Sequence, residues 1–222
     1  MAGLKINTEP SVEPISTAEA KTFLRIDSSA EDTLIDNLIK TSRIYCEEYT
    51  GRSLINQTWD FYLDGFSEVK TDLWEGMRIA PDISMKQRYI SIPRSPLVSV
   101  TSITTYDDAD TATVFSSSKY YVDNVSEPAR IVLRDGQAWA TSLRVANAVK
   151  VTYVSGYGES ATNIPEALIT GIKEHILYLY ENRGDDDSSN IPVIAKQLYQ
   201  PYKILRFNIN AFANNTVGSQ LI

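Results

Sequence analysis

The sequence predicts an α+β fold in which a bundle of about four helices is interrupted by an antiparallel β sandwich or barrel-like insert and followed by an extended C-terminal tail. Apolar residues recur at helical spacing over residues 16–52 and again over 159–202. Between these segments, over 53–158, the period changes to two, and turn-rich joins separate six short strand candidates. Because the helical segments flank the insert in sequence, we expect them to meet in space as one bundle.

The bulk composition is that of a globular chain of 222 residues, 43% apolar and 22% charged. A net charge of -7 and a pI near 4.8 disfavour a protein that grips nucleic acid over a broad surface, because such surfaces need clustered Lys and Arg. No apolar run approaches the roughly 20 residues that cross a bilayer. Residues 1–10 lack the basic and apolar regions of a signal peptide. We therefore expect a protein made in a cytosol-like compartment, with no membrane partner.

The chain is expected to begin with an extended arm and a short helix. Residues 1–15 contain two prolines and show no periodicity, which indicates the arm. Ser16 followed by Glu19 is a capping-box pattern, and it opens a helix that should run to about Ile26.

A longer helix is expected from Ser28 or Ser29 to about Thr50, with Gly51 as a left-handed cap. Cys46 lies at the edge of its apolar face, which indicates a buried structural cysteine. A single cysteine excludes an intramolecular disulfide and a cysteine-based zinc cage. The side opposite the apolar face carries charged residues: Asp36, Lys40, Arg43 and Glu47.

The insert begins where Trp59, Phe61 and Leu63 alternate with polar residues, the pattern of a half-buried strand. Residues 65–87 are irregular and indicate a long loop. The acidic residues of 107–110 suit a hairpin turn between two strands. The five further strand candidates cover 88–92, 98–106, 112–122, 129–133 and 148–154.

The helix predicted from Pro165 to Arg183 carries more apolar residues than one face requires. One stripe at helical spacing comprises Leu168, Ile172, Ile176 and Leu179. Leu177 projects from the opposite side, and the tyrosines at 178 and 180 widen the apolar surface further. A helix that is apolar on two sides usually has two neighbours. We predict that one neighbour is the chain's own bundle and that the other is a second copy, contacted through Leu177, Tyr178 and Glu181.

The last helix should start near Pro192 and end before Pro201. Residues 203–222 are expected to form a tail for docking on a partner. Within this tail, apolar and polar residues first alternate as in a strand, and the apolar positions are Leu205, Phe207, Ile209 and, just beyond the alternation, Phe212. A terminal strand with one apolar face commonly completes its hydrogen bonds on the edge of a partner's sheet.

No motif in the sequence brings catalytic residues together. The single histidine, His175, lies close to the apolar stripe of the central helix, and no motif places a Ser or Cys nucleophile to use it. The acidic runs at 107–110 and 185–187 lack the alternating ligands, glycine and distal glutamate of a calcium loop. We therefore expect no catalytic, metal or cofactor site.

Two functions from other classes stay open on the residues alone. A carbohydrate-binding module would use aromatic side chains of the insert, such as Trp74. A hydrolase would use His175, which would then have to be exposed in a pocket.

A series of short matches, spread in order over about residues 10–183, resembles one known family. The matching residues are Glu19-Ala20-Lys21, Leu24-Arg25-Ile26-Asp27, Asp32 through Leu38, Glu48-Tyr49-Thr50-Gly51-Arg52, Trp59, Pro93, Pro96-Leu97, Ser99-Val100, Ser102-Ile103, Val151-Thr152-Tyr153, Gly156-Tyr157, Pro165, Leu177-Tyr178 and Tyr180-Glu181-Asn182-Arg183. Their order and spacing are similar to those of the head-to-tail connector proteins (adaptor or head-completion proteins) of long-tailed double-stranded DNA phages and related gene-transfer particles. The match fades past Arg183.

The resemblance implies a structural virion protein of the neck that does no covalent chemistry. It implies a dodecameric ring under the portal protein, which lengthens the channel for double-stranded DNA without sequence-specific contacts and docks the next neck or tail-completion protein. In that setting we expect Asp185, Asp186 and Asp187 to face an acidic or neutral channel. We expect the tail over 203–222 to dock on the portal or on a neighbouring subunit.

Overall fold

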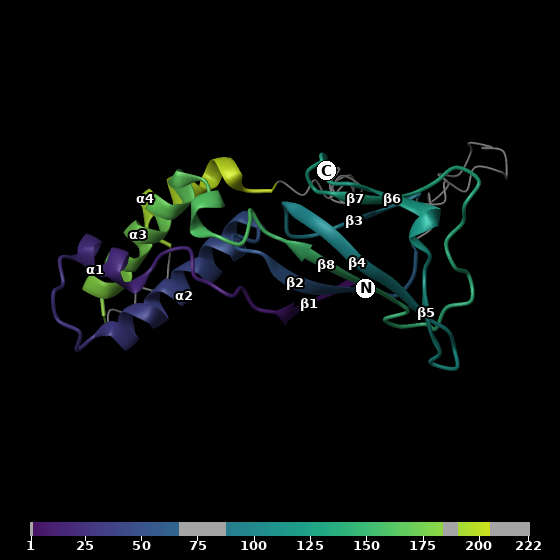
Figure 1. The fold of residues 1–222 in the computed structure, drawn as a ribbon, viewed down its shortest axis with the longest axis horizontal. Helices are drawn as coiled ribbons and strands as arrows, with labels where there is room; N and C mark the ends of the chain where they lie inside the picture. The colour runs from purple at the N-terminus through teal and green to yellow at the C-terminus, as the bar shows by residue number, and fades with distance from the viewer. Residues whose placement is uncertain (1, 67–87, 184–190, 205–222) are drawn as a thin grey trace, which may run out of the picture.

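The structure is a computed structural model, and it describes residues 2–66, 88–183 and 191–204. The molecule is elongated, with the helices packed together at one end and two β-sheets at the other (Figure 1). The α+β class expected from the sequence is confirmed.

Among the described residues, the helical end contains four α-helices, drawn from both ends of the chain. They are α1 (Thr17–Leu24), α2 (Asp32–Thr50), α3 (Glu166–Glu181) and α4 (Val193–Tyr199), and a 3₁₀ turn (Gln200–Tyr202) continues from α4. Their shared core joins residues before and after the β strands: Ile35, Ile39, Cys46, Leu168, Ile172, Ile176 and Tyr199 are all buried in it. The two helical segments therefore meet in one bundle, as their positions in the sequence indicate.

Local chemistry at the helix ends accounts for most of their boundaries. The Ser16 N–H donates to Glu19 Oε2 (2.9 Å) and the Glu19 N–H donates to Ser16 Oγ (3.3 Å), which confirms the capping box. Gly51 has a φ of 73° and caps α2 in the left-handed conformation. The start of α2 differs from expectation, because the Ser28 hydroxyl accepts the Ala30 N–H (3.2 Å) in a local turn and the helix begins only at Asp32.

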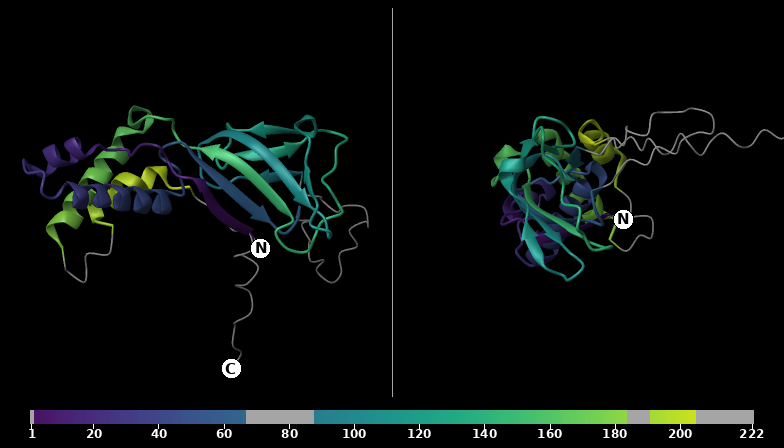
Figure 2. Two further views of the ribbon diagram at one scale, coloured as in Figure 1. Left: turned by 60° about the horizontal axis from the view of Figure 1, so that its bottom comes forward. Right: turned by 90° about the vertical axis from the view of Figure 1, so that its right-hand side faces the viewer.

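The β end is a sandwich of a five-stranded and a three-stranded antiparallel sheet, in the orders β1-β2-β8-β4-β5 and β3-β7-β6 (Figures 1 and 2). The strands are β1 (Ala2–Thr8), β2 (Gln57–Leu63), β3 (Tyr89–Ser91), β4 (Leu97–Tyr106), β5 (Ala112–Val114), β6 (Tyr120–Asp123), β7 (Arg130–Leu133) and β8 (Val149–Ser155). Alternate residues of both sheets fill the core between them, among them Trp59, Ile90, Ile103, Ile131, Val151 and Tyr153.

Two segments differ from the sequence-based expectation. The first is the arm over 1–15, in which Ala2–Thr8 pair with β2 as the edge strand β1, so the β part also draws on the start of the chain. The second is the single strand expected over 112–122, which is two strands, β5 and β6, in different sheets. A 3₁₀ turn (Ser117–Lys119) separates them, and the Ser116 hydroxyl accepts the Ser118 N–H at its start. By contrast, the Asp107 carboxylate accepts the N–H groups of Ala109 and Thr111 (2.9 and 2.8 Å), as expected for the hairpin turn.

Candidate assembly surfaces and the joint between bundle and sandwich

Helix α3 packs on its own bundle through the predicted apolar stripe. Leu168, Ile172 and Ile176 are buried, and α3 contacts α1, α2 and α4. Leu177 lies on the side of the helix opposite this stripe, given the helical repeat of about 3.6 residues. Leu177 and Tyr178 are half-buried and Glu181 is exposed. The structure contains one chain, so the contact of these three residues with a second copy stays a prediction.

Tyr180, one of the residues of α3 outside its buried stripe, makes contacts inside the chain. The Tyr180 hydroxyl donates to the Glu31 carboxylate, and Arg183 Nη1 binds the same carboxylate at 3.0 Å. The Arg183 guanidinium also lies over the Tyr180 ring, 4.3 Å from its centroid. These contacts tie the end of α3 to the start of α2. The hydrogen bond from the Tyr180 hydroxyl, followed by the one from the Arg183 guanidinium, holds the pKa of Glu31 below its ordinary value.

His175 is a packed residue of the bundle core. Its side chain is 1% exposed and its ring meets that of Tyr45 edge-on, with 5.4 Å between centroids. Burial lowers the pKa of His175 from 6.5 to about 4, because the apolar surroundings disfavour the charged imidazolium. The hydrolase alternative required an exposed histidine in a pocket, and the structure does not provide one.

A cluster of polar residues occupies the junction of the bundle and the sandwich; we call it the joint cluster, and it comprises Arg43, Glu47, Arg52, Gln57 and Arg94. Its centre is the Glu47 carboxylate, which accepts from Arg43 Nη1 (3.0 Å), the Leu54 N–H (2.9 Å) and Gln57 Nε2 (2.8 Å). Burial raises the pKa of Glu47, while the Leu54 hydrogen bond and the positive charge of Arg43 oppose the rise. These contacts join α2 to the segment that leads into β2.

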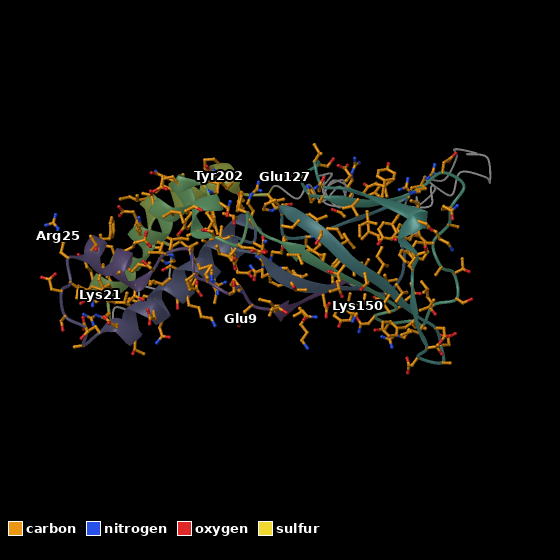
Figure 3. The ribbon with its side chains drawn as sticks, viewed as in Figure 1. Glu9, Lys21, Arg25, Glu127, Lys150 and Tyr202 are labelled. Carbon is orange, nitrogen blue, oxygen red and sulfur yellow. The ribbon has the colours of Figure 1, made fainter. Side chains whose placement is uncertain are left out.

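Two further arginines extend the joint cluster towards the sandwich. Arg94 donates to the Glu47 backbone carbonyl (2.8 Å), pairs with the Glu48 carboxylate and lies over the Trp59 ring at 5.0 Å. Arg52 pairs with Glu127 (2.6 Å) and donates to the carbonyl of Tyr202 (2.6 Å). Figure 3 labels both partners, Glu127 and Tyr202. The joint cluster thus connects α2, the turn before β4, the turn before β7 and the end of the described chain.

Sequence periodicity did not reveal the joint cluster. It places Arg43 and Glu47 on the side of α2 away from the apolar face, yet they are only 3% and 5% exposed. Both are buried because Arg43 binds the carboxylates of Glu13 and Glu47, while Glu47 also accepts from the Leu54 N–H and from Gln57 Nε2. The sequence feature that could have indicated the cluster is the spacing of four residues between Arg43 and Glu47, which places the two side chains next to each other on a helix.

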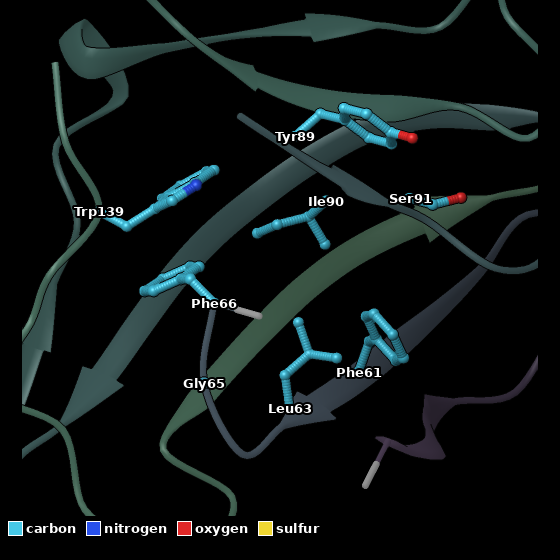
Figure 4. A pocket seen from close by; sticks show the side chains of 8 residues that line it. All are labelled: Phe61, Leu63, Gly65, Phe66, Tyr89, Ile90, Ser91 and Trp139. Atoms are coloured by element: carbon cyan, nitrogen blue, oxygen red, sulfur yellow. The ribbon is translucent and has the colours of Figure 1, made fainter. Parts of the chain in front are cut away.

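A small apolar pocket lies between the sheets, next to the end of β2 (Figure 4). It encloses about 160 Å³, and its lining includes Phe61, Leu63, Phe66, Ile90 and Trp139. The Trp139 ring stacks on Phe66 with 4.4 Å between centroids. One face of this tryptophan is therefore covered within the chain.

Several predicted site residues lie outside the described residues. These are the loop residues Asp185, Asp186 and Asp187, the tail residues Leu205, Phe207, Ile209 and Phe212, and the candidate sugar-stacking residue Trp74. Within the ranges that the structure describes, no three His, Cys, Asp or Glu side chains are grouped to hold a metal ion. None of the described helices combines the length and the apolarity that a membrane crossing requires.

The chain is an α+β protein with a helical bundle, a β sandwich and a polar joint between them, and comparison with known proteins gives its family. Residues 15–125 match the family model of the phage gp6-like head-tail connector proteins. This match covers half of the chain, and the protein belongs to that family. It therefore has a structural connector role at the head–tail junction of a virion, and the resemblance noted from the sequence is confirmed.

Solved structures share the fold over almost the whole chain. One is a chain from the virion of a native gene transfer agent (GTA) particle, with a TM-score of 0.71 and 18% identity, covering 92% of this chain and 96% of that one. A chain from the neck of an empty GTA particle, computed with C6 symmetry, has a TM-score of 0.72 and 16% identity, and the match covers 92% of this chain and 97% of that one. A chain from the neck of a native GTA particle, computed with C12 symmetry, has a TM-score of 0.63 and 18% identity, and the match covers 91% of this chain and 97% of that one. A search of curated proteins gives no match.

Proposed function

We propose that this connector assembles as a ring directly below the portal protein, lengthens the DNA channel there and docks the next neck or tail-completion protein. The observation that carries the proposal is membership of the head-tail connector family together with a fold shared with GTA neck chains over more than nine-tenths of each chain. Those necks were computed with C6 and C12 symmetry, which supports a ring of twelve copies of this chain.

A cyclic ring joins one patch of each copy to a different patch of the next copy. The outer side of α3, with Leu177, Tyr178 and Glu181, is the proposed first patch. Its support is that a half-buried leucine stands on the side of the helix away from the bundle core. The tail, with Leu205, Phe207, Ile209 and Phe212, is proposed to dock on the portal or on a neighbouring copy, which its alternating pattern supports.

The channel wall is proposed to be acidic or neutral, with Asp185, Asp186 and Asp187 facing the lumen. DNA must slide through such a channel, and clustered cations would hold its phosphates. The net charge of -7 supports this proposal. A ring structure whose lumen is lined by lysine and arginine would contradict it.

The proposed role requires no catalysis, metal or cofactor. The burial of His175 supports a purely structural role against the hydrolase alternative. No observation favours a second function.

Negative-stain electron microscopy of the purified protein, alone and mixed with its portal, tests the ring proposal. We expect closed rings that stack coaxially on the portal. Monomers that stay free in the presence of assembled portal would overturn the proposal.

A further inference from the structure

Strand β1 leaves one long edge of the five-stranded sheet open. It stands at the end of the strand order and pairs only with β2 among the described strands, so its outer backbone groups face away from the sheet. An edge of this kind is a template for pairing with another strand. No proline interrupts Ala2–Thr8, and one lysine, Lys5, is the only charged residue within it.

The other described sheet edges are poorer templates. Strand β5 and strand β3 have three residues each and β6 has four, whereas β1 has seven. Strand β4 is open beyond its short pairing with β5, but its register against β8 shifts twice, and such bulges hinder edge pairing. Strand β1 keeps a regular register with β2 from Ala2 to Ile6, and its one register shift lies between Ile6 and Thr8, at the end of the strand.

The two faces of β1 have opposite character. Leu4 and Ile6 lie opposite Phe61 and Trp59 on the face towards the sandwich core, and Leu4 is still 37% exposed. The other face carries Lys5 and Asn7, and Asn7 donates to the Asp60 carboxylate (3.0 Å). A strand added at this edge should therefore be apolar on the core side, where it would cover Leu4, and polar on the other.

The C-terminal tail has the matching pattern and length. Residues 205–211 alternate between the apolar Leu205, Phe207, Ile209 and Ala211 and the polar Arg206, Asn208 and Asn210. The alternating part of the tail and β1 are both seven residues long, and five residues of β1, Ala2–Ile6, are in regular register with β2. The pattern also presents apolar side chains to one face of the sheet and polar ones to the other.

The position of the chain before the tail indicates which copy of β1 receives it. The Ile204 N–H donates to the Thr50 carbonyl (2.8 Å), which fixes the last described residue at the end of α2. Tyr202 and Glu9, the residue that follows β1, lie on opposite sides of the molecule (Figure 3). Since the alternating pattern starts at Leu205, directly after Ile204, a tail that paired with β1 of its own copy would have to use part of the pattern to pass around α2.

We propose that residues 205–211 of one copy add as a sixth strand to the open edge of β1 in a second copy. This inference rests on the proposed ring and names one of its contacts. The contact joins two different patches of the chain, as a cyclic ring requires. The ordered strand covers Leu4 of the acceptor and completes the backbone hydrogen bonds of β1.

Cysteine cross-linking between differently tagged copies tests the proposal. Copies with Lys5→Cys are co-expressed with longer, tagged copies that carry Asn208→Cys or Asn210→Cys, and rings are oxidised before separation by size. We expect a disulfide-linked product of one short and one long copy, because both cysteines lie on the polar face. The native Cys46 is buried and contributes no background. The matched control is Ala211→Cys, which places the thiol on the opposite face and should give several-fold less product.

The outcomes separate this inference from the proposed ring. Rings that form normally but give no cross-link, or give only a link within one copy, overturn the tail contact and leave the ring standing. An equal yield from Ala211→Cys and Asn210→Cys also overturns it, since collision and not strand pairing would then explain the product. A link between copies without closed rings supports the tail contact and counts against the ring.

Discussion

Gly171 marks the place where the ring of Tyr199 reaches the backbone of α3. A Cβ atom at this position would lie 2.4 Å from Tyr199 Cε1 and 3.0 Å from Cδ1, and the tyrosine is fully buried. Glycine inside a helix usually weakens it by about 1 kcal/mol relative to alanine. Here the close approach of α4 reverses that preference, because the tyrosine has no room to withdraw.

We expect Gly171→Ala to lower the free energy of unfolding by about 1–3 kcal/mol, the usual cost of overpacking a core. Urea denaturation measures the change. The neighbouring Thr170→Ala, on a half-buried position of the same turn, should change stability by less than about 0.5 kcal/mol. Gly171→Ala combined with Tyr199→Leu should recover part of the loss, and a stabilised Gly171→Ala protein would contradict the proposed packing.

Glu47 is the residue on which the joint cluster depends. Glu47→Ala would leave the buried Arg43 guanidinium without one partner and the Leu54 N–H and Gln57 amide without an acceptor. We expect a loss of about 3–5 kcal/mol in the free energy of unfolding, as for other broken buried ion pairs. Glu48→Ala is the matched control: its side chain is 65% exposed, so its pair with Arg94 should be worth at most about 1 kcal/mol. Equal losses for the two variants would argue against a special role for Glu47.

His175 should make stability depend on pH in a defined window. Its pKa is about 4 in the folded protein and 6.5 ordinarily, so the unfolded chain binds the extra proton first as the pH falls. The neutral form therefore stabilises the fold fully above pH 6.5, and this contribution is lost as the pH falls towards 4. Its full size is on the order of 3 kcal/mol. Unfolding measured between pH 7 and 4 should show a shallower decline for His175→Phe than for the native protein; parallel curves would contradict the assignment.

At the scale of elements, much of the fold follows from local patterns. The capping box at Ser16, the glycine cap at Gly51 and the alternating strand at Trp59 each depend on residues close in sequence, so the sequence suffices to predict them. Pairing across the chain is different. The strand pattern of β1 is too short to stand out from an arm, and only its pairing with β2, more than fifty residues away, reveals it.

The candidate interface on α3 likewise combines features that the local sequence predicts with a contact that depends on residues far apart in the chain. The sequence correctly indicated a helix with apolar residues beyond its buried stripe. It could not show that Tyr180 and Arg183 meet Glu31 within the chain, because that contact spans about 150 residues. The apolar surface of α3 that is proposed to contact a second copy is therefore narrower than the sequence indicated, and Leu177 lies at its centre.

We expect Leu177→Asp to leave a folded chain but to impair ring assembly. The side chain is half-buried on the side of α3 away from the core, so the folded state should tolerate a charge that a subunit contact would not. Circular dichroism would report the fold, and sedimentation velocity the assembly. Leu168→Asp, at a fully buried position of the same helix, should unfold the chain and serves as the contrast. An unfolded Leu177→Asp protein would show that Leu177 belongs to the ordinary core.

At the scale of the whole molecule, the joint cluster links the helical bundle and the sandwich of an elongated chain, whose shape Figure 2 shows from two further sides. Three arginines and a buried glutamate connect the bundle to both the start and the turns of the sandwich. A ring built from copies of such a chain needs the bundle and the sandwich in one constant relation, since an error in their angle would repeat at every subunit.

The central claim is that this chain is the ring-forming connector of a phage neck. A cryo-electron microscopy reconstruction of the neck of the assembled particle tests it most directly. We predict density for twelve copies of the bundle and sandwich in a closed ring against the portal, with the DNA channel at its centre. A neck whose portal is followed by a ring of a different chain, with no density that fits this fold, would contradict the account.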